Sequence, residues 1–228
     1  MAWPVADAEQ IAQFRARGWL AVPDAIPPEA VDDLARRVAP VHTTPALAMR
    51  WEGRDPADEP GDHVLQSMLE MVWVDWQSAP FHAWTLDFSS ALMGAPARFW
   101  YNQLLDKPPL RGAATWWHQD GASVGADVGA RMISAWMALD AVDVTSGCMH
   151  FEDRGHLAGV VDHQELAKID CGRGACQVDP AAVVAAPLPK GGLTFHLGLT
   201  PHMAPANRSP IWRQVLIQRF VVGPLPQP

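Results

Sequence analysis

The sequence predicts an α+β fold in which helices come first and an antiparallel barrel or double sheet follows. Over about residues 1–94, apolar residues recur at helical spacing between capping and stop residues. Over about residues 95–223, short apolar runs are bounded by Gly, Pro, Asp or Asn, which is typical of strands joined by turns. We find no internal repeat and expect one domain over residues 1–228, with a helical part followed by a barrel core.

The first helix is predicted by the residues at its two ends. Asp7 followed by Gln10 has the spacing of a capping box, and Gly18 is a typical C-terminal stop. Residues 19–23, WLAVP, then predict a short strand. Residues 27–40, PPEAVDDLARRVAP, predict a second helix that is opened and closed by prolines.

The stretch from His42 to about Gly61 is rich in Pro and Asp, and we expect a mobile loop over one face of the domain. Residues 79–94 predict a further helix that ends at Gly94. The segments predicted as the main core strands are 99–106, 132–140, 148–153, 191–198 and 212–222.

Composition and charge narrow the classes of partner. The chain has 228 residues and 49% hydrophobic content, so it can bury a sizeable core. Its 17 basic and 25 acidic residues give a net charge of −8, which argues against nucleic acid and anionic membrane as partners. Three cysteines without a CxxC pair, and an N-terminus without a signal-peptide pattern, lead us to expect a cytoplasmic protein.

The motif with the clearest chemistry is the His118–Asp120 pair in WWHQDGASVG. If this stretch is a strand, residues two apart point to the same side, and both side chains face the barrel interior. His-x-Asp is a weak signal alone and also suits an ordinary loop. One further histidine would complete the two-histidine, one-carboxylate triad of non-haem Fe(II) oxygenases, and His202 and His196 are the candidates.

An arginine on the last predicted strand supports the same chemistry. Arg213 shares a strand face with Val215 and Ile217, and an inward guanidinium is costly unless it meets an anion. The distal carboxylate of 2-oxoglutarate is such an anion, and a guanidinium fork binds it better than an ammonium does. The co-substrates expected beside Fe(II) are therefore 2-oxoglutarate and O₂.

Four stretches resemble the phytanoyl-CoA dioxygenase family of Fe(II)/2-oxoglutarate oxygenases. They are FRARGWLAVPDAIPPEAVDDL, LLDKPPLRGAATWWHQD, ISAWMALDAVDVTSGCMHF and GGLTFHLGLTPHMAPANRS with the arginine that follows. The resemblance implies a double-stranded β-helix, a cupin-like jelly-roll barrel with N-terminal and flanking helices. It also implies a metal-dependent oxidoreductase that releases succinate and CO₂.

The same resemblance implies a role for individual residues. His118, Asp120 and His202 would bind iron, and Arg213 would bind the 5-carboxylate of 2-oxoglutarate. Lys107 and Trp136 resemble the residues that border the co-substrate. Where the family often has a Ser or Thr two places after the second histidine, this chain has Ala204, so Thr200 is the expected partner of Arg213.

The expected function is oxidation of an unactivated C–H bond of a small molecule, such as a natural-product or amino-acid-derived intermediate. The alternative is a cupin-like metal-binding isomerase, lyase or ligand-binding protein without oxygenase activity. Such a protein has no need for an inward arginine, so Arg213 distinguishes the two. The sequence leaves the substrate, the outcome of the oxidation and the oligomeric state open.

Overall fold

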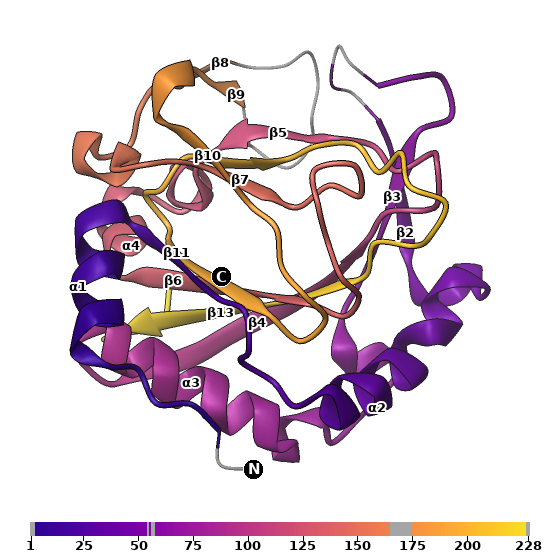
Figure 1. The fold of residues 1–228 in the computed structure, drawn as a ribbon, viewed down its shortest axis with the longest axis horizontal. Coiled ribbons are helices and arrows are strands. Elements are labelled where there is room, and N and C mark those ends of the chain that lie inside the picture. Colours follow the sequence, from indigo (N-terminus) through magenta and orange to yellow (C-terminus); the bar gives the residue numbers. More distant parts are fainter. Residues whose placement is uncertain (1–2, 54, 56–57, 165–174, 227–228) are drawn as a thin grey trace.

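The computed structural model describes residues 3–53, 55, 58–164 and 175–226. Two antiparallel sheets face each other, and helices cover the outer face of the larger sheet (Figure 1). The larger sheet has the strand order β1-β11-β6-β13-β4-β3-β2, and the smaller has the order β10-β7-β12-β5. The alternation of distant strands, such as β13 between β6 and β4, is that of a jelly-roll barrel and confirms the predicted fold class.

The larger sheet consists of β1 (Trp19–Val22), β2 (Met49–Glu52), β3 (His63–Ser67), β4 (Ala97–Asp106), β6 (Met132–Ala138), β11 (Leu193–Leu197) and β13 (Val215–Val222). The smaller sheet consists of β5 (Thr115–His118), β7 (Met149–Glu152), β10 (Val183–Ala186) and β12 (His202–Ala204). A two-residue pair, β8 (His163–Gln164) and β9 (Ala175–Cys176), forms a separate hairpin-like sheet.

The helices are α1 (Ala8–Arg17), α2 (Pro28–Val38), α3 (Pro80–Met93) and the short α4 (Ala126–Ala130). The capping box at Asp7 and Gln10 is present, and Gly18 and Gly94 end α1 and α3 in the left-handed conformation. The three sequence-based helix predictions are therefore confirmed, because each had local end signals. None of the helices in the described residues is long and apolar enough to span a lipid bilayer.

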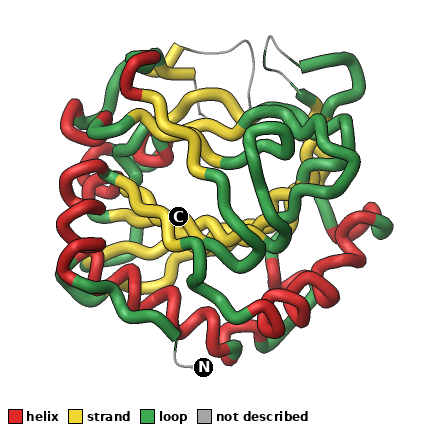
Figure 2. The backbone as a smooth tube through the Cα atoms, viewed as in Figure 1, coloured by secondary structure: helices red, strands yellow, loops and turns green. Residues whose placement is uncertain are grey.

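Strand alternation divides the apolar residues into two cores. One face of the large sheet carries residues such as Ile133, Phe195 and Phe220, which pack with the apolar faces of α1, α2 and α3. Figure 2 shows these helices along one side of the large sheet. The opposite face carries Trp136 and Ile217, which pack against residues of the smaller sheet. The space between the sheets is therefore lined partly by apolar side chains, and the histidine and arginine side chains that also line it are buried.

Two local expectations were wrong. The segment from His42 to Gly61 is not an irregular loop throughout, because residues 49–52 form β2 and pair with β3 at the edge of the large sheet. Pro and Asp residues flank this strand, so the composition of the segment as a whole indicated a loop. The predicted strand at WWHQD ends at His118, and Asp120 begins a 3-10 turn, Asp120–Ser123. The strand predicted over residues 19–23 is present as β1 of the large sheet, whereas β2 and β3 come from a part of the chain in which no strand was predicted.

Candidate functional site

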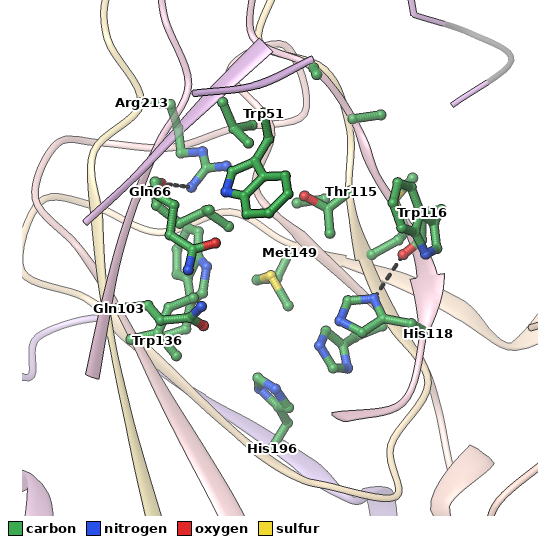
Figure 3. Close-up of a pocket in the computed structure, with 18 of the residues that line it drawn as sticks. Trp51, Gln66, Gln103, Thr115, Trp116, His118, Trp136, Met149, His196 and Arg213 are labelled. Atoms are coloured by element: carbon green, nitrogen blue, oxygen red, sulfur yellow. Dashed lines mark hydrogen bonds between the residues drawn. The ribbon is translucent and has the colours of Figure 1, made fainter. Parts of the chain in front are cut away.

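A cavity of about 290 Å³ is lined by side chains from both sheets (Figure 3). Histidines gather at one end, and a guanidinium occupies the other end. Its lining includes three tryptophans, three histidines and two arginines: Trp51, Trp116, Trp136, His118, His196, His202, Arg213 and Arg219.

Two neighbouring strands of the smaller sheet present His118 and His202 side by side. They lie opposite each other in the β5–β12 register, and their ring centroids are 4.2 Å apart. The Nδ1 atom of each donates to a backbone carbonyl two residues earlier, Trp116 O and Thr200 O, at 2.8 Å. A carbonyl only accepts, so Nδ1 carries a proton, and in the neutral ring Nε2 then keeps the lone pair that a metal requires.

The electrostatic surroundings favour neutral imidazole at this position. Burial, and then the neighbouring His118 and His196, hold the pKa of His202 well below its usual value. A neutral ring is the form that coordinates a metal ion. The ring of His202 is therefore in the state that metal binding needs at neutral pH.

Asp120 is held from two strands of the larger sheet. The hydroxyl of Ser134 donates to Oδ2 at 2.9 Å, and Arg219 donates from Nε to Oδ2 at 3.2 Å and from Nη2 to Oδ1 at 3.1 Å. The third nitrogen of that guanidinium, Nη1, donates to Gln103 at 2.6 Å. Burial opposes the charge on Arg219, but the adjacent carboxylate raises the pKa of Arg219 above its usual value.

One ligand atom from each of His118, Asp120 and His202 can be chosen so that all three lie within 4.8 Å of one another. Two neutral imidazoles and one carboxylate are the donor set of the facial triad that holds non-haem Fe(II) and leaves positions open. The structure thus brings together the three residues predicted from the sequence, and their donor chemistry fits iron.

His196 lies close to the same group. Its Nε2 is 3.6 Å from Oδ2 of Asp120, and its ring centroid is 4.3 Å from that of His202. Burial lowers the pKa of His196, although Asp120 opposes this shift, and neither ring nitrogen has a hydrogen-bond partner within the described part of the chain. The rivalry between His196 and His202 foreseen from the sequence therefore has a structural basis, since both rings face Asp120.

Arg213 occupies the opposite end of the cavity. Its Nη1 donates to the carbonyl of Leu105 at 2.9 Å, whereas Nε and Nη2 are buried and have no partner among the described residues. The guanidinium lies over Trp136, at 5.6 Å from the ring centroid. Burial lowers the pKa of Arg213 to about 10, so the group is still charged at neutral pH.

Of the remaining predicted site residues, Trp136 lines the cavity, whereas Lys107 and Thr200 donate to backbone carbonyls and do not line it. The Lys107 ammonium donates to the carbonyls of Ala204 at 2.8 Å and Pro205 at 2.6 Å, and burial holds the pKa of Lys107 well below its usual value. The Thr200 hydroxyl donates to Gly18 at 2.7 Å, because Thr200 lies in the turn between β11 and β12 and packs at the end of α1. The structure therefore does not bring Thr200 to Arg213.

The role of Arg219 at Asp120 was not predicted from the sequence. The sequence did indicate that Arg219 points inward, because residues 213, 215, 217 and 219 share one face of the last strand. What the sequence could not supply was the partner, since Asp120 follows β5 of the smaller sheet and Arg219 lies on β13 of the larger sheet, so the two meet only when the sheets pack together.

We expect Arg219→Met to destabilise the metal-free protein by about 3–5 kcal/mol, because it leaves the buried Asp120 carboxylate without its cation. A divalent ion should restore much of this loss, since the ion supplies positive charge at the same carboxylate. Mn(II) should therefore raise the Tm of the variant by more than it raises that of the parent. Arg219→Lys, which keeps the charge, is the matched control and should behave more like the parent. Equal Mn(II)-dependent shifts in the parent and Arg219→Met would contradict this account.

Comparison with known proteins gives a consistent result. The family model described as phytanoyl-CoA dioxygenase (PhyH) matches residues 14–215. No curated protein matches the sequence at a significant level. Among solved structures, the chain is similar to EvdO2 from Micromonospora carbonacea var. aurantiaca in complex with 2-oxoglutarate. The two share 26% identity over 100% of this chain and 97% of that chain, with a TM-score of 0.80.

Two further solved structures share the fold at lower identity. The epimerase SnoN, in complex with Fe3+, alpha ketoglutarate and nogalamycin RO, is 21% identical over 94% of this chain and 82% of that chain, with a TM-score of 0.76. AviO1 from Streptomyces viridochromogenes Tue57 is 23% identical over 100% and 99% of the two chains, with a TM-score of 0.69.

Proposed function

The chain belongs to the phytanoyl-CoA dioxygenase family and is a non-haem iron- and 2-oxoglutarate-dependent enzyme, and from this premise we propose that it oxidises an unactivated C–H bond of a small molecule, with release of succinate and CO₂. His118, Asp120 and His202 would hold the iron, and Arg213 would hold the distal carboxylate of 2-oxoglutarate. When bound, the iron supplies the site at which O₂ is activated.

The observation that carries this proposal is the arrangement of the two ends of one cavity. A two-histidine, one-carboxylate donor set lies at one end, and at the other end lies a buried guanidinium, two of whose N–H groups find no acceptor among the residues that the structure describes. A metal barrel without 2-oxoglutarate chemistry has no use for a buried cation that faces its own cavity. A dicarboxylate that chelates a metal through one end and accepts hydrogen bonds from the guanidinium at its other end would occupy both the metal site and the Arg213 site.

The protein residues contribute positioning and exclusion of water. The Nδ1 hydrogen bonds to Trp116 O and Thr200 O fix the two imidazoles, and Ser134 and Arg219 fix the carboxylate of Asp120. Lys107 ties the end of β12 to β4 through the carbonyls of Ala204 and Pro205, and so supports the strand that carries His202. Trp136 would border the co-substrate beneath the guanidinium.

We propose a compact natural-product or amino-acid-derived intermediate as the substrate class. Relatives of the same fold include SnoN, whose structure contains nogalamycin RO, and a carbocyclase from nogalamycin biosynthesis, SnoK. The cavity of about 290 Å³ suits a small molecule.

Among the described residues, Cys148 and Cys176 are free thiols, which fits a reducing cytoplasmic location.

The test is anaerobic addition of Fe(II) and 2-oxoglutarate. We expect the weak visible charge-transfer band of the metal chelate, and we expect succinate to form once O₂ and a suitable substrate are admitted. Fe(II) with a 2-oxo acid that lacks the distal carboxylate is the control and should give the band only at much higher concentration. A protein that binds Fe(II) but neither shows the band nor consumes 2-oxoglutarate would overturn the proposal.

A further inference from the structure

At the end of the cavity that Arg213 occupies, three buried N–H groups have no acceptor within the described part of the chain. They are Nε and Nη2 of Arg213 and Nε1 of Trp51. Both side chains line the cavity, and Figure 3 shows the Trp51 indole at the same end of the cavity as the Arg213 guanidinium. A buried donor without an acceptor is unfavourable, and most such groups in proteins are satisfied. Three that gather in one place indicate an acceptor that comes from outside the chain.

The two free nitrogens of Arg213 define which edge of the guanidinium is available. Nη1 is occupied by the carbonyl of Leu105, so Nε and Nη2 remain, and together they form the side-on fork of the group. That fork matches the two oxygens of a carboxylate. A carboxylate offers about four lone-pair sites, so two are left for other donors after the fork has formed.

Trp51 is placed in the cavity by β2 and not by core packing. The strand pairs Trp51 with Val64 of β3, and the other three residues of β2, Met49, Arg50 and Glu52, are exposed. Trp51 belongs to neither hydrophobic core, although it is the one partly buried side chain of its strand. Its ring therefore faces the cavity from an edge strand that contributes little else to the interior.

We propose that Trp51 is a binding residue for 2-oxoglutarate, whose indole N–H donates to the same distal carboxylate that Arg213 grips. This assignment rests on the proposed function, because it takes 2-oxoglutarate as the occupant of the cavity. Neither Ala204, which has no hydroxyl, nor Thr200, whose hydroxyl donates to Gly18, supplies a second donor to this carboxylate. Trp51 supplies it from β2, a different part of the chain.

The first experiment compares binding of two 2-oxo acids by calorimetry, with Mn(II) in place of iron. Trp51→Phe keeps the aromatic plane and removes only the N–H. It should weaken 2-oxoglutarate binding on the order of tenfold, as expected for one hydrogen bond to a charged group. Binding of 2-oxopentanoate, which lacks the distal carboxylate, should not change. The control is Trp73→Phe, because Trp73 packs on the helical core and stacks with Arg37, away from the cavity. It should leave both affinities unchanged.

The second experiment observes the indole directly. In protein with ¹⁵N-labelled tryptophan and Zn(II), the indole signal that Trp51→Phe removes should shift downfield with 2-oxoglutarate and not with 2-oxopentanoate. In an Arg213→Leu background, Trp51→Phe should cause a smaller loss of affinity than in the parent, because the two groups share one ligand.

The outcomes separate the inference from the proposed function. Equal weakening of both oxo acids, or no weakening of either, would overturn the role of Trp51 while leaving 2-oxoglutarate binding by the parent intact. Failure of the parent to bind 2-oxoglutarate with any divalent metal would overturn the proposed function itself.

Discussion

Replacing His118 or His202 with alanine will abolish iron binding and succinate formation while the protein remains folded. Each change removes one of three ligands from a site that already has open positions, so the remaining two hold the metal weakly. Both side chains line the cavity, so truncation enlarges an existing space instead of opening a void in the core. Metal content after Fe(II) loading, succinate production and the Tm of the metal-free protein are the measurements.

Asp120 calls for a different substitution. Asp120→Ala would also remove a ligand, but it would leave the buried Arg219 guanidinium without its anion and would destabilise the fold. Asp120→Asn removes the negative charge, and with it both the anionic ligand and the ion pair, but it keeps the side-chain volume and one carbonyl acceptor for Arg219, so it should destabilise the fold less than Asp120→Ala does. Near-normal turnover in Asp120→Asn would contradict the assignment of Asp120 as an iron ligand.

His196 provides the internal comparison for the histidine assignments. His196→Ala leaves His118, Asp120 and His202 in place, so we expect the variant to retain iron and a measurable fraction of the activity. If His196→Ala loses iron and His202→Ala keeps it, the two histidines have exchanged roles. The geometry makes this a sharp comparison, because Nε2 of His196 is 3.6 Å from Oδ2 of Asp120, a ring nitrogen of His202 lies within 4.8 Å of the same carboxylate, and the two ring centroids are 4.3 Å apart.

Arg213→Leu will raise the KM for 2-oxoglutarate by about 10²-fold or more. The fork makes two charge-assisted hydrogen bonds of about 1.5–3 kcal/mol each, and about 1.4 kcal/mol corresponds to a factor of ten. Iron binding should change little, because the guanidinium lies at the opposite end of the cavity from the histidines. The measurement is a KM series for 2-oxoglutarate and for a 2-oxo acid without the distal carboxylate, with Fe(II) titrations alongside.

Arg213→Lys is the graded control. An ammonium restores the charge without the planar fork, so its KM should fall between those of the parent and Arg213→Leu. The oxo acid without the distal carboxylate should lose its disadvantage in Arg213→Leu, because no cation is left unpaired. If Arg213→Leu uses 2-oxoglutarate as well as the parent does, the binding cation lies elsewhere, and Arg219 is then the candidate that also lines the cavity.

The parts of the fold that could be predicted were those with local signals. The helices α1 and α3 carry their own start and stop residues, so their ends were predicted to within a residue or two. Strand β2 carries no such signal, because Pro and Asp surround it and three of its four side chains are exposed. It is defined by pairing with β3, which is a long-range property that composition does not contain.

The residues of the candidate site also divide into those with a signal in the sequence and those defined only by long-range contacts. His118 and Asp120 came from a motif, Arg213 from strand alternation, and the choice of His202 over His196 from a resemblance, and the structure brings the three predicted iron ligands together. The strand argument that placed Asp120 beside His118 was wrong in detail, since a 3-10 turn presents the carboxylate. The partners of these residues depend on contacts between distant segments. Trp51 lies at the same end of the cavity as Arg213, and Arg219 meets Asp120, only once the sheets have assembled.

The positions of the two histidine-bearing strands in the smaller sheet give them unequal local stability. β12 is an interior strand with a hydrogen-bonded neighbour on each side, whereas β5 is the last strand of its sheet. Opening an edge strand costs less free energy than opening an interior strand. Amide hydrogen exchange measures this difference residue by residue. We therefore expect the strand that carries His118 to open more readily than the strand that carries His202. Release of a bound ion would accordingly follow the opening rate of β5 and would not require unfolding of the barrel.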